Sequence, residues 1–247
     1  MNGYKVFLIA VLSLFLVSCD GSRDKNTWLV GTSADNHPYE YMKDGEIVGF
    51  DIDLAVAIGQ HLGKNIEFKN MDFHGLLAAL ASKNVDLVMA GMSITPERMA
   101  EVAFSIPYTE AKVAILSRGE DNLKTLEDLK GKNIGAQLGT TWALAAKEMS
   151  VIYGFRTQTL ANNLMLVEEL KTKRSDAVVL EEMQAKAFVA MYPEFVSFSV
   201  PQYSTSFAVA MPKDSPIKED IDRAINDLKG DGTIDILARK WGIISGQ

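Results

Sequence analysis

Thr95, Pro96 and Arg98 follow a short apolar run and have the residue types expected at the start of a helix. The Thr95 hydroxyl can cap such a helix, and Pro96 lacks a backbone N–H that would be unpaired there anyway. Unpaired N–H groups and the helix dipole favour an anion at this end. Arg98 adds a rigid two-pronged donor that matches a carboxylate, and Ser93 offers a hydroxyl from the preceding loop. These residues indicate an anion site, or else a well-capped helix whose arginine is solvated.

Other kinds of chemistry find little support in the sequence. The spacing of Asp51 and Asp53 resembles a metal-binding pair, but Asp51 precedes an amphipathic stretch and is interpreted as the N-cap of a helix. His37, His61 and His74 lack the spacing of metal ligands. The motifs of the usual hydrolase elbow and of the phosphate-binding P-loop are both absent from the sequence. We therefore expect no metal ion and no other cofactor.

The elements that would position the anion site alternate between short apolar runs and amphipathic stretches. In the first half, strands are predicted at 28–32, 47–50, 65–69 and 86–90, and helices at 52–62 and 75–82. After Ser117 the pattern repeats, with strands at 132–137, 176–180 and 207–211 and helices at 142–149, 164–171, 217–229 and 233–240. This alternation predicts mostly parallel sheets covered by helices on both faces. We therefore expect two α/β lobes joined by crossing strands near 109–113 and 203–207.

Length and charge agree with this organisation. The 247 residues are enough for two lobes of about a hundred residues each. The formal net charge of −7 argues against nucleic acid, and against an anionic membrane face, as the main partner.

The first residues have the pattern of a secretory signal. Lys5 supplies a positive charge, and 6–17 is an apolar run that is too short to span a bilayer comfortably. The segment 16–19 (LVSC) then resembles a bacterial lipobox, in which the cysteine is acylated and becomes the first mature residue. We expect a signal peptide at 1–18 and a lipidated tether at 19–27, with palmitate on Cys19 as the membrane anchor. An ordinary signal peptide with an incidental cysteine is the alternative.

Several motifs, in order along nearly the whole mature chain, resemble one family. Ala90–Arg98 (AGMSITPER), followed by Phe104–Tyr108 (FSIPY), resembles the signature of the polar amino-acid-binding proteins of ABC importers, the bacterial extracellular solute-binding proteins of family 3. Gly49–Ala55 (GFDIDLA) is similar to the second hallmark of that family. The segments 129–132 (LKGK) and 139–141 (GTT) are similar to its second-lobe motifs.

This resemblance implies a fold and a set of lobe boundaries. The expected fold is the α/β, two-lobed periplasmic-binding-protein fold with two crossing hinge strands, known as type II. Lobe 1 would comprise residues 28–112 plus 207–247, and lobe 2 residues 113–206.

The resemblance also implies which residues hold the carboxylate of a free amino acid. The arginine with which the family clamps the ligand α-carboxylate falls on Arg98. Ser93 matches an assisting hydroxyl, and Gly91 matches a residue that bonds the ligand through its backbone. Thr141 matches a contact from the opposite lobe, where a second helix start would aim free N–H groups across the cleft.

Other positions of the family pattern concern the ligand ammonium and side chain. Where the family has an aspartate after the second-lobe strand, this chain has Glu181, with Glu182 as the nearby competitor; a solvated acidic pair is the alternative. Phe73 falls where the family has a wall against the ligand side chain, although it could equally be core. Ser33 and Asn36 occupy positions that are often aspartate and tyrosine in binders of basic amino acids. Both departures count against a lysine- or arginine-specific site.

The ligand therefore stays open between a neutral polar amino acid such as glutamine and a basic one such as arginine. The sequence slightly favours a polar ligand stated no more finely. Asp35, Glu40 and Asp72 could supply replacement carboxylates for a basic ligand, but the sequence gives them no place in the site.

We expect a monomeric substrate-binding lipoprotein of an amino-acid ABC transporter on the periplasmic side of the cell membrane. It would close around a free polar or basic L-amino acid, dock on a membrane permease and catalyse no reaction. One alternative is an enzyme on the same fold that resembles cyclohexadienyl dehydratase, in which Glu181 would be the general acid. The other alternative is an amino-acid sensor or adhesin that takes no part in transport.

Overall fold

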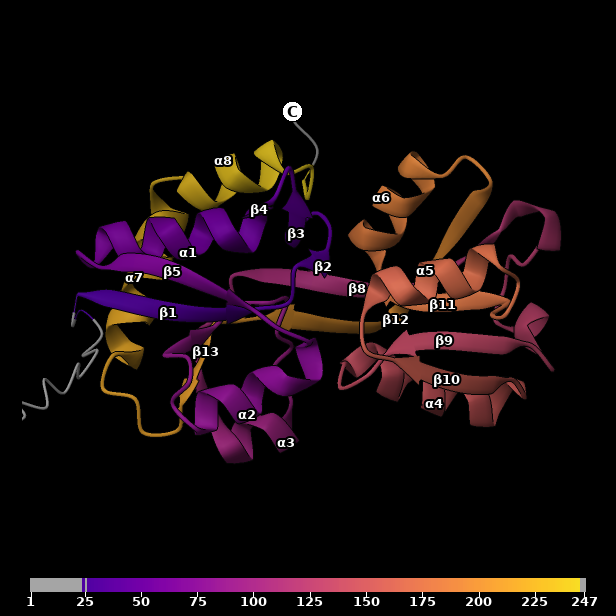
Figure 1. The fold of residues 1–247 in the computed structure, drawn as a ribbon, viewed down its shortest axis with the longest axis horizontal. Coiled ribbons are helices and arrows are strands. Elements are labelled where there is room, and N and C mark those ends of the chain that lie inside the picture. Colours follow the sequence, from indigo (N-terminus) through magenta and orange to yellow (C-terminus); the bar gives the residue numbers. More distant parts are fainter. Residues whose placement is uncertain (1–23, 25, 245–247) are drawn as a thin grey trace, which may run out of the picture.

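The computed structural model describes residues 24 and 26–244, which form two α/β lobes placed side by side (Figure 1). Two long strands, β8 (Thr109–Arg118) and β12 (Phe195–Phe207), run between the lobes and belong to the sheet of the second lobe. No helix in the described part of the chain is long and apolar enough to cross a membrane. The predicted signal peptide at 1–18 and the acylation site at Cys19 lie outside the described residues.

The first lobe is built on a five-stranded sheet in the order β5-β1-β6-β13-β7. β1 pairs in parallel with β5 and β6, whereas β13 is antiparallel to β6 and β7. A small antiparallel sheet, β2-β3-β4, lies beside the first helix. The bounds are β1 (Thr27–Thr32), β2 (Asp35–Asn36), β3 (Glu40–Lys43), β4 (Glu46–Val48), β5 (Asn65–Asn70), β6 (Leu87–Val88), β7 (Val102–Phe104) and β13 (Ala210–Pro212).

Helices cover both faces of the first-lobe sheet (Figure 1). They are α1 (Phe50–His61), α7 (Lys218–Gly230) and α8 (Thr233–Lys240) on one side and α2 (Leu76–Ala81) and α3 (Pro96–Glu101) on the other. Side chains alternate between the two faces along a strand. Leu87 and Met89 accordingly join the core under α1 and α7, while Val88 and Ala90 join the core under α2. This double burial explains why the segment is an unbroken apolar run.

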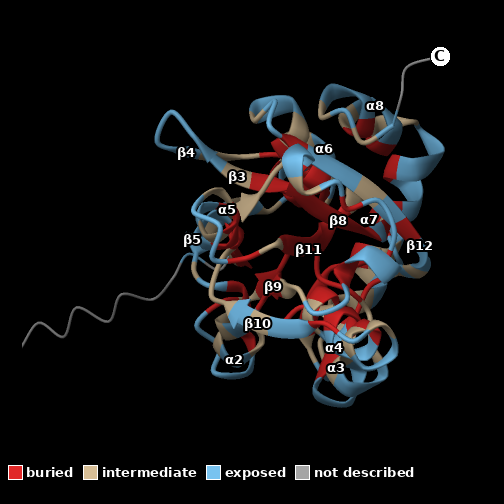
Figure 2. Ribbon diagram, turned by 90° about the vertical axis from the view of Figure 1, so that its right-hand side faces the viewer, coloured by how far each residue is buried: buried red, intermediate tan, exposed pale blue. Residues whose placement is uncertain are grey.

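The second lobe contains a five-stranded sheet in the order β10-β9-β11-β8-β12. β9 pairs in parallel with β10 and β11, and β8 is antiparallel to both β11 and β12. Figure 2 shows β8, β9 and β11 as buried strands, with exposed surface on the surrounding helices. The further elements are β9 (Asn133–Gln137), β10 (Arg156–Leu160), β11 (Ala177–Glu181), α4 (Thr141–Tyr153), α5 (Asn163–Lys171) and α6 (Glu182–Met191).

The two crossing strands predicted from the sequence are present. β8 and β12 pair in antiparallel register from Thr109 opposite Phe207 to Arg118 opposite Phe195, with an irregularity between Val200 and Ser204. Because the chain crosses between the lobes twice, each sheet receives strands that return in the opposite direction. The sheets are therefore mixed, although a mostly parallel arrangement was expected.

The N-cap predicted at Asp51 is wrong. Helix α1 begins at Phe50, Gly49 holds the cap position, and Asp51 is fully buried in the first turn. The Oδ2 atom of Asp51 accepts hydrogen bonds from the Gly91 backbone N–H, at 2.8 Å, and from the Tyr108 hydroxyl, at 2.7 Å. A buried carboxylate needs such donors, and here they come from other parts of the chain. Asp51 therefore fastens two segments to α1.

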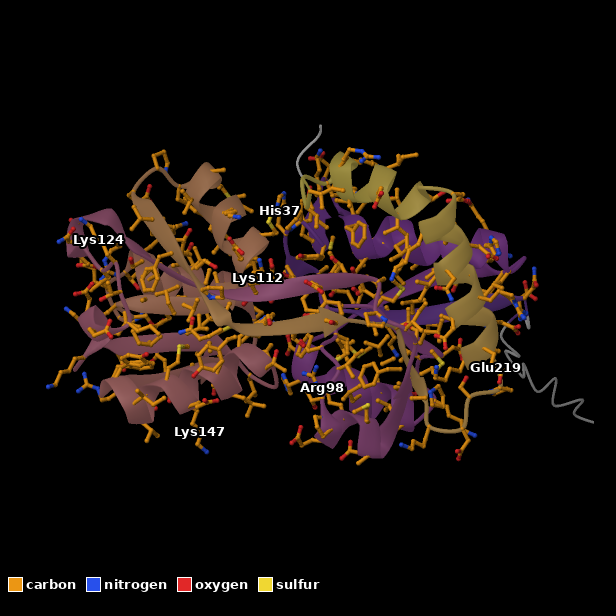
Figure 3. The ribbon with its side chains drawn as sticks, turned by 180° about the vertical axis from the view of Figure 1, so that it is seen from behind. His37, Arg98, Lys112, Lys124, Lys147 and Glu219 are labelled. Atoms are coloured by element: carbon orange, nitrogen blue, oxygen red, sulfur yellow. The ribbon has the colours of Figure 1, made fainter. Side chains whose placement is uncertain are left out.

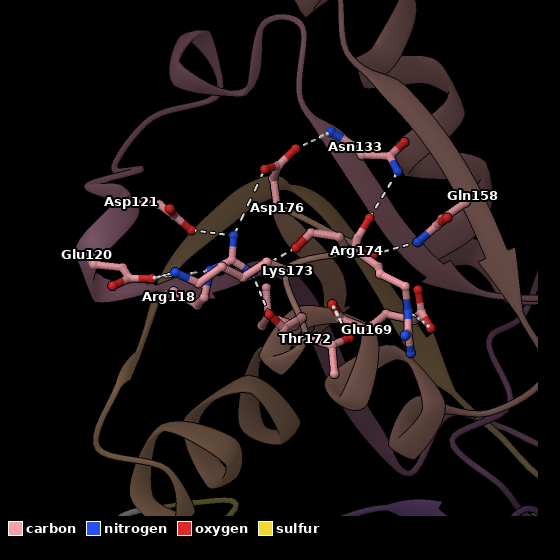
Figure 4. A network of polar contacts seen from close by, with 12 residues as sticks. Arg118, Glu120, Asp121, Asn133, Gln158, Glu169, Thr172, Lys173, Arg174 and Asp176 are labelled. Atoms are coloured by element: carbon pink, nitrogen blue, oxygen red, sulfur yellow. Dashed lines mark hydrogen bonds and ion pairs between the residues drawn. The ribbon is translucent and has the colours of Figure 1, made fainter.

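A second buried charge, Arg118, ends β8 and lies in a network of polar contacts (Figure 4). Its Nη1 atom donates to the carbonyl oxygens of Leu170 and, at 2.8 Å, of Ser175. Its Nη2 atom lies 2.6 Å from a carboxylate oxygen of Asp121 and 3.9 Å from one of Asp176. These contacts join the end of α5 to the sheet, so the arrangement is structural.

Candidate functional site

Helix α3 begins as the sequence predicts. Thr95 is its N-cap, and Pro96 is its first residue. The Thr95 Oγ1 atom accepts a hydrogen bond from the backbone N–H of Arg98 at 3.2 Å. This confirms the predicted cap and places the Arg98 side chain in the first turn.

Arg98 lies where the two lobes face each other (Figure 3). Its Nη1 atom donates to the Ser93 carbonyl oxygen at 2.7 Å, and its Nη2 atom donates to the Gly139 carbonyl oxygen of the second lobe at 2.9 Å. The guanidinium carbon lies 5.5 Å from the centre of the Phe73 ring, within the range of a cation–π contact. Burial lowers the pKa of Arg98 to about 10, so this group remains charged at neutral pH.

A second helix start approaches Arg98 from the other lobe. Helix α4 begins at Thr141, and its cap Thr140 accepts a hydrogen bond from the Ala143 N–H at 3.1 Å. The Thr141 Oγ1 atom lies 3.0 Å from the Ser93 Oγ atom of the first lobe. Two helix N-termini and a guanidinium therefore lie close to one another, which suits an anion.

A narrow cavity of about 10 Å³, partly open to solvent, lies between the lobes. This volume holds about one water molecule, so the lobes leave little free space between them in this closed arrangement. The first lobe lines it with Asp35, Asn36, Glu40, Phe73, Ala90, Gly91 and Ser93, and the second with Gln137, Thr140, Thr141, Trp142, Asn163 and Gln184.

The predicted ligand contacts divide into two groups by their place at this cavity. Those that line it are Asn36, Phe73, Gly91, Ser93 and Thr141. Those that do not line it directly are Ser33, Arg98 and Glu181. Arg98 contacts the cavity wall through its bond to Ser93. Gln137, Asn163 and Gln184 also line the cavity and were not expected from the sequence, although Gln137 ends a parallel strand, where ligands commonly bind.

Gly91 has a backbone that suits glycine. Its φ of +56° lies in the left-handed region, and a Cβ atom there would come within 3.0 Å of Asn36 Nδ2 and 3.2 Å of the Phe207 ring. Its N–H is held by Asp51, whose pKa burial raises to about 6. The Gly91 loop is therefore fixed from below by α1 and cannot accept a side chain without strain.

Glu40 is a carboxylate that the sequence could not place, and it lies in the cavity wall. Its side chain is fully buried, and its Oε1 atom accepts a hydrogen bond from Asn36 Nδ2 at 3.0 Å. The Oε2 atom has no hydrogen-bond partner among the described residues. Burial, and then the charge of Asp51, raise the pKa of Glu40 well above its usual value.

Asp35 also lines the cavity and reaches the second lobe. Its Oδ2 atom accepts hydrogen bonds from Gln137 Nε2 at 2.9 Å and from the Asn163 backbone N–H at 2.7 Å. Ser33 is buried beside it, and its hydroxyl donates to Asp35 Oδ1 at 3.3 Å. Burial raises the pKa of Asp35 to about 6. Asp72, the third acidic candidate, is exposed and does not line the cavity.

Glu181 ends β11 and caps α6. Its Oε2 atom accepts hydrogen bonds from the backbone N–H groups of Met183, at 2.6 Å, and Gln184, at 3.0 Å. The residue is buried, and burial raises its pKa to about 7. Glu182 is less buried and forms an ion pair with Lys186 at 2.8 Å. The two acidic neighbours therefore have different environments.

The carboxylates around the cavity act on one another. The charges of Asp51, Asp35 and Glu181 all raise the pKa of Glu40. These charges add to burial, which is the largest cause, and both favour the neutral form of Glu40. In the described part of the chain, no group of three or more His, Cys, Asp or Glu residues is arranged to hold a metal ion. An organic cation would relieve the repulsion.

Comparison with known proteins places the chain in a family. The family described as bacterial extracellular solute-binding proteins, family 3, matches residues 29–243. The arginine-binding extracellular protein ArtP of Bacillus subtilis is 36% identical over 98% of this chain and 98% of its own. A probable histidine-binding protein of Campylobacter jejuni is 34% identical over 95% of this chain and 96% of its own.

Solved structures show the same fold. An ancestral arginine-binding protein bound to arginine has a TM-score of 0.82 and 41% identity, over 88% of this chain and 98% of its own. The arginine-, lysine-, histidine-binding protein ArtJ of Geobacillus stearothermophilus has a TM-score of 0.83 and 32% identity, over 90% and 97%. The two-lobed periplasmic-binding-protein fold is thereby confirmed. Because the family match also spans nearly all of the described residues, this chain belongs to the bacterial extracellular solute-binding proteins of family 3.

Proposed function

We propose that the protein captures a free cationic amino acid, arginine first among them, by closing its two lobes around it. The observation that carries this proposal is the buried Oε2 atom of Glu40, which has no partner among the described residues and belongs to a residue of the cavity wall. A buried carboxylate oxygen without a donor costs about 1–3 kcal/mol or more, and a ligand cation beside it would remove that cost.

The other end of the cavity suits the zwitterionic part of the ligand. Gly91, whose N–H already donates to Asp51, would offer its backbone carbonyl oxygen to the ligand ammonium. Arg98, Ser93 and Thr141 would bind the α-carboxylate. These groups converge within hydrogen-bonding distance of one another, which supports a shared anionic ligand. Glu181 would hold the ammonium, since its carboxylate is buried nearby and carries a negative charge once ionised.

The side chain of the ligand would extend toward the acidic wall. Phe73 would pack against its methylene groups, and Glu40 and Asp35 would face its positive end. Asn36 and Ser33 would act through these carboxylates, because they donate hydrogen bonds to Glu40 and Asp35 respectively. Glu40 and Asp35 supply the negative charge that the uncharged Ser33 and Asn36 lack. We therefore propose a cationic ligand in place of the neutral polar one that the sequence slightly favoured.

In this role the chain is the substrate-binding component of an amino-acid ABC transporter. It delivers its ligand to a membrane permease and acts as a binding protein, not as an enzyme. The relatives and structures that match it are described as binding proteins, which supports this. Lobe 1 would comprise 28–112 plus 207–247 and lobe 2 would comprise 113–206, with closure about β8 and β12.

The proposal includes an anchored monomer on the periplasmic side of the cell membrane. The support is the sequence LVSC at 16–19, after an apolar run that fits a signal peptide. Labelling with radioactive palmitate tests the anchor: the native protein should incorporate label, and Cys19→Ser should not. Equal labelling of both proteins would contradict acylation at Cys19.

A thermal-shift panel of the twenty amino acids tests the ligand. Arginine should raise the melting temperature most, because at equal concentrations the ligand with the lowest Kd stabilises the folded state most. A ligand present at a hundred times its Kd contributes about 2.7 kcal/mol. Lysine and histidine should give smaller shifts. A larger shift with glutamine than with arginine would contradict the cationic ligand, and no shift with any amino acid would contradict the proposed function itself.

A further inference from the structure

We propose that Asp35 is a latch that holds the two lobes together and so sets the fraction of the protein that is closed. The latch acts on the cleft of the proposed function, but it does not depend on which amino acid binds there. In this proposal Asp35 is a positioning residue, because its bonds bring the second lobe to the ligand site.

Three hydrogen bonds between the lobes converge on this one residue. Gln137, at the end of β9, donates to the Asp35 carboxylate at 2.9 Å. The backbone N–H of Asn163, the first residue of α5, donates to the same oxygen at 2.7 Å. Gln184, on α6, donates to the Asp35 carbonyl oxygen at 2.9 Å. Three elements of the second lobe are therefore tied to a single residue of β2.

The partners of Asp35 also hold one another through contacts inside the second lobe. Asn163 Nδ2 donates to Gln137 Oε1 at 3.0 Å, and Gln137 Nε2 also donates to the Ala161 carbonyl oxygen at 3.3 Å. Both contacts lie within the second lobe, so they fix the Gln137 amide without help from the first. On the other side, Ser33 orients the carboxylate. The latch thus forms between two preorganised halves, which limits the entropy lost on closure.

Charge adds to this geometry. Helix α5 has nine residues, and its N-terminal N–H groups carry the positive end of its dipole. A carboxylate that accepts one of these N–H groups forms a charge-assisted hydrogen bond, which is stronger than a neutral one. Gln137, Asn163 and Gln184 are all nearly fully buried in the closed form. Opening the lobes would break these bonds and expose their donors to water.

The other contacts between the lobes have a different character. Ser93 with Thr141, and Arg98 with Gly139, join groups that the proposed function assigns to the ligand carboxylate or places beside it. The Asp35 bonds instead use the Asn163 backbone and two glutamine amides. Because Asp35 also lines the cavity, an experiment must separate its bonds to the second lobe from the effect of its charge on the ligand.

Substitution of Asn163 provides that separation. Asn163→Pro removes the backbone donor and leaves the charge of the cavity unchanged. Proline is favoured at the first position of a helix, and Asn162 already has the extended conformation (φ −140°, ψ 163°) that a following proline requires. Asn163→Ala is the matched control, because it loses the same side chain but keeps the N–H. The difference between these two variants isolates the bond to Asp35.

Small-angle X-ray scattering of the ligand-free protein measures the latch directly. Asn163→Pro and Asp35→Ala should both increase the radius of gyration relative to Asn163→Ala. The double variant Asp35→Ala with Asn163→Pro should show no further increase over Asp35→Ala, because Asp35→Ala already removes the bond from the Asn163 N–H as well as that from Gln137. Circular dichroism and the melting temperature identify any variant that fails to fold. If either Asn163→Pro or Asp35→Ala fails to fold, the other variant tests the latch. Equal radii for Asn163→Pro and Asn163→Ala would overturn the latch.

Binding kinetics provide a second measurement. With arginine as the probe, Asn163→Pro should raise the dissociation rate about tenfold over Asn163→Ala and leave the association rate nearly unchanged, because a closed complex opens more readily without the latch. Unchanged dissociation would also count against it. A change in the ligand-free radius without any arginine binding would keep the latch and overturn the proposed ligand. If arginine binds but Asn163→Pro changes neither the radius of gyration nor the dissociation rate, the proposed ligand stands and the latch is overturned.

Discussion

The hydroxyl oxygens of Ser93 and Thr141 lie 3.0 Å apart, although the first precedes α3 in one lobe and the second begins α4 in the other. The contact brings together the N-terminal ends of two helices. Arg98 lies beside it and bonds the backbone on both sides, through Ser93 and Gly139. The positive ends of two helix dipoles and one guanidinium thus share a small region, which suits an anion.

Arg98→Ala should weaken arginine binding by about a hundredfold or more. The substitution removes two charge-assisted hydrogen bonds, each of which contributes roughly 1.5–3 kcal/mol. Isothermal titration calorimetry measures the change. Arg223→Ala is a matched control, since Arg223 is an exposed arginine of the same lobe that forms an ion pair with Asp220. Native affinity in Arg98→Ala would rule out Arg98 as the carboxylate clamp.

Glu40→Gln should change which amino acid binds best. The substitution keeps the acceptor for Asn36 but removes the negative charge, so arginine should lose about 1.5–3 kcal/mol of binding free energy while glutamine loses little. Competition calorimetry with the two amino acids measures the ratio of the arginine Kd to the glutamine Kd in the native protein and in the variant. Glu67→Gln, on an exposed position of β5, serves as the control. Parallel losses for both ligands would show that Glu40 does not select charge.

Glu181→Gln should separate ligands by their α-amine. Arginine should bind roughly tenfold more weakly, because the ammonium loses an anionic partner, whereas a guanidino acid of the same length without the amine should be unaffected. The amide oxygen can still cap α6, so the melting temperature of the ligand-free protein should change little. Glu182→Gln is the control; it removes the ion pair with Lys186 and the neighbouring charge that helps to raise the pKa of Glu181. If Glu182→Gln gave the larger effect, the ammonium site would belong to that residue.

The ligand-free protein should become less stable as the pH rises from about 4 to about 7. Burial raises the pKa of Asp35 and Asp51 to about 6 and that of Glu181 to about 7. Between their ordinary and raised values, the folded protein binds more protons than the unfolded chain does. The free energy of unfolding therefore falls with rising pH in this window. Thermal melts across the range measure it, and a flat profile would contradict the raised values.

Arginine affinity should show the opposite trend and increase over the same pH range. A cationic ligand requires ionised carboxylates, so below the raised pKa values its binding must displace protons. Calorimetry in two buffers with different heats of ionisation should detect proton release near pH 6, and glutamine should cause much less. Equal proton release by both ligands would argue against pairing of the ligand cation with these groups.

Local features of the sequence predicted much of what the structure contains. Thr95 caps α3 and Pro96 begins it, as expected. The crossing strands near 109–113 and 203–207 are part of β8 and β12. These predictions succeed because helix capping acts within three or four residues and strand burial follows the alternation of neighbouring side chains. The N-cap at Asp51 failed because a local rule was applied to a side chain whose partners are distant.

The sequence alone determined the pair of α/β lobes, the helix start at Thr95 and Pro96, and the family resemblance, all of which depend on short segments. Only the tertiary structure decided where the acidic groups lie. Asp51 meets the Gly91 N–H across 40 positions, and Asp35 meets Gln137 and Asn163 across 102 and 128. The Asp35 pairings depend on the passage of the chain from one lobe to the other through β8, whereas the Asp51 pairing depends on how α1 packs inside the first lobe. The burial that raises the pKa of each carboxylate also results from this tertiary packing. No local pattern of residue types predicts which distant segments the folded chain brings together.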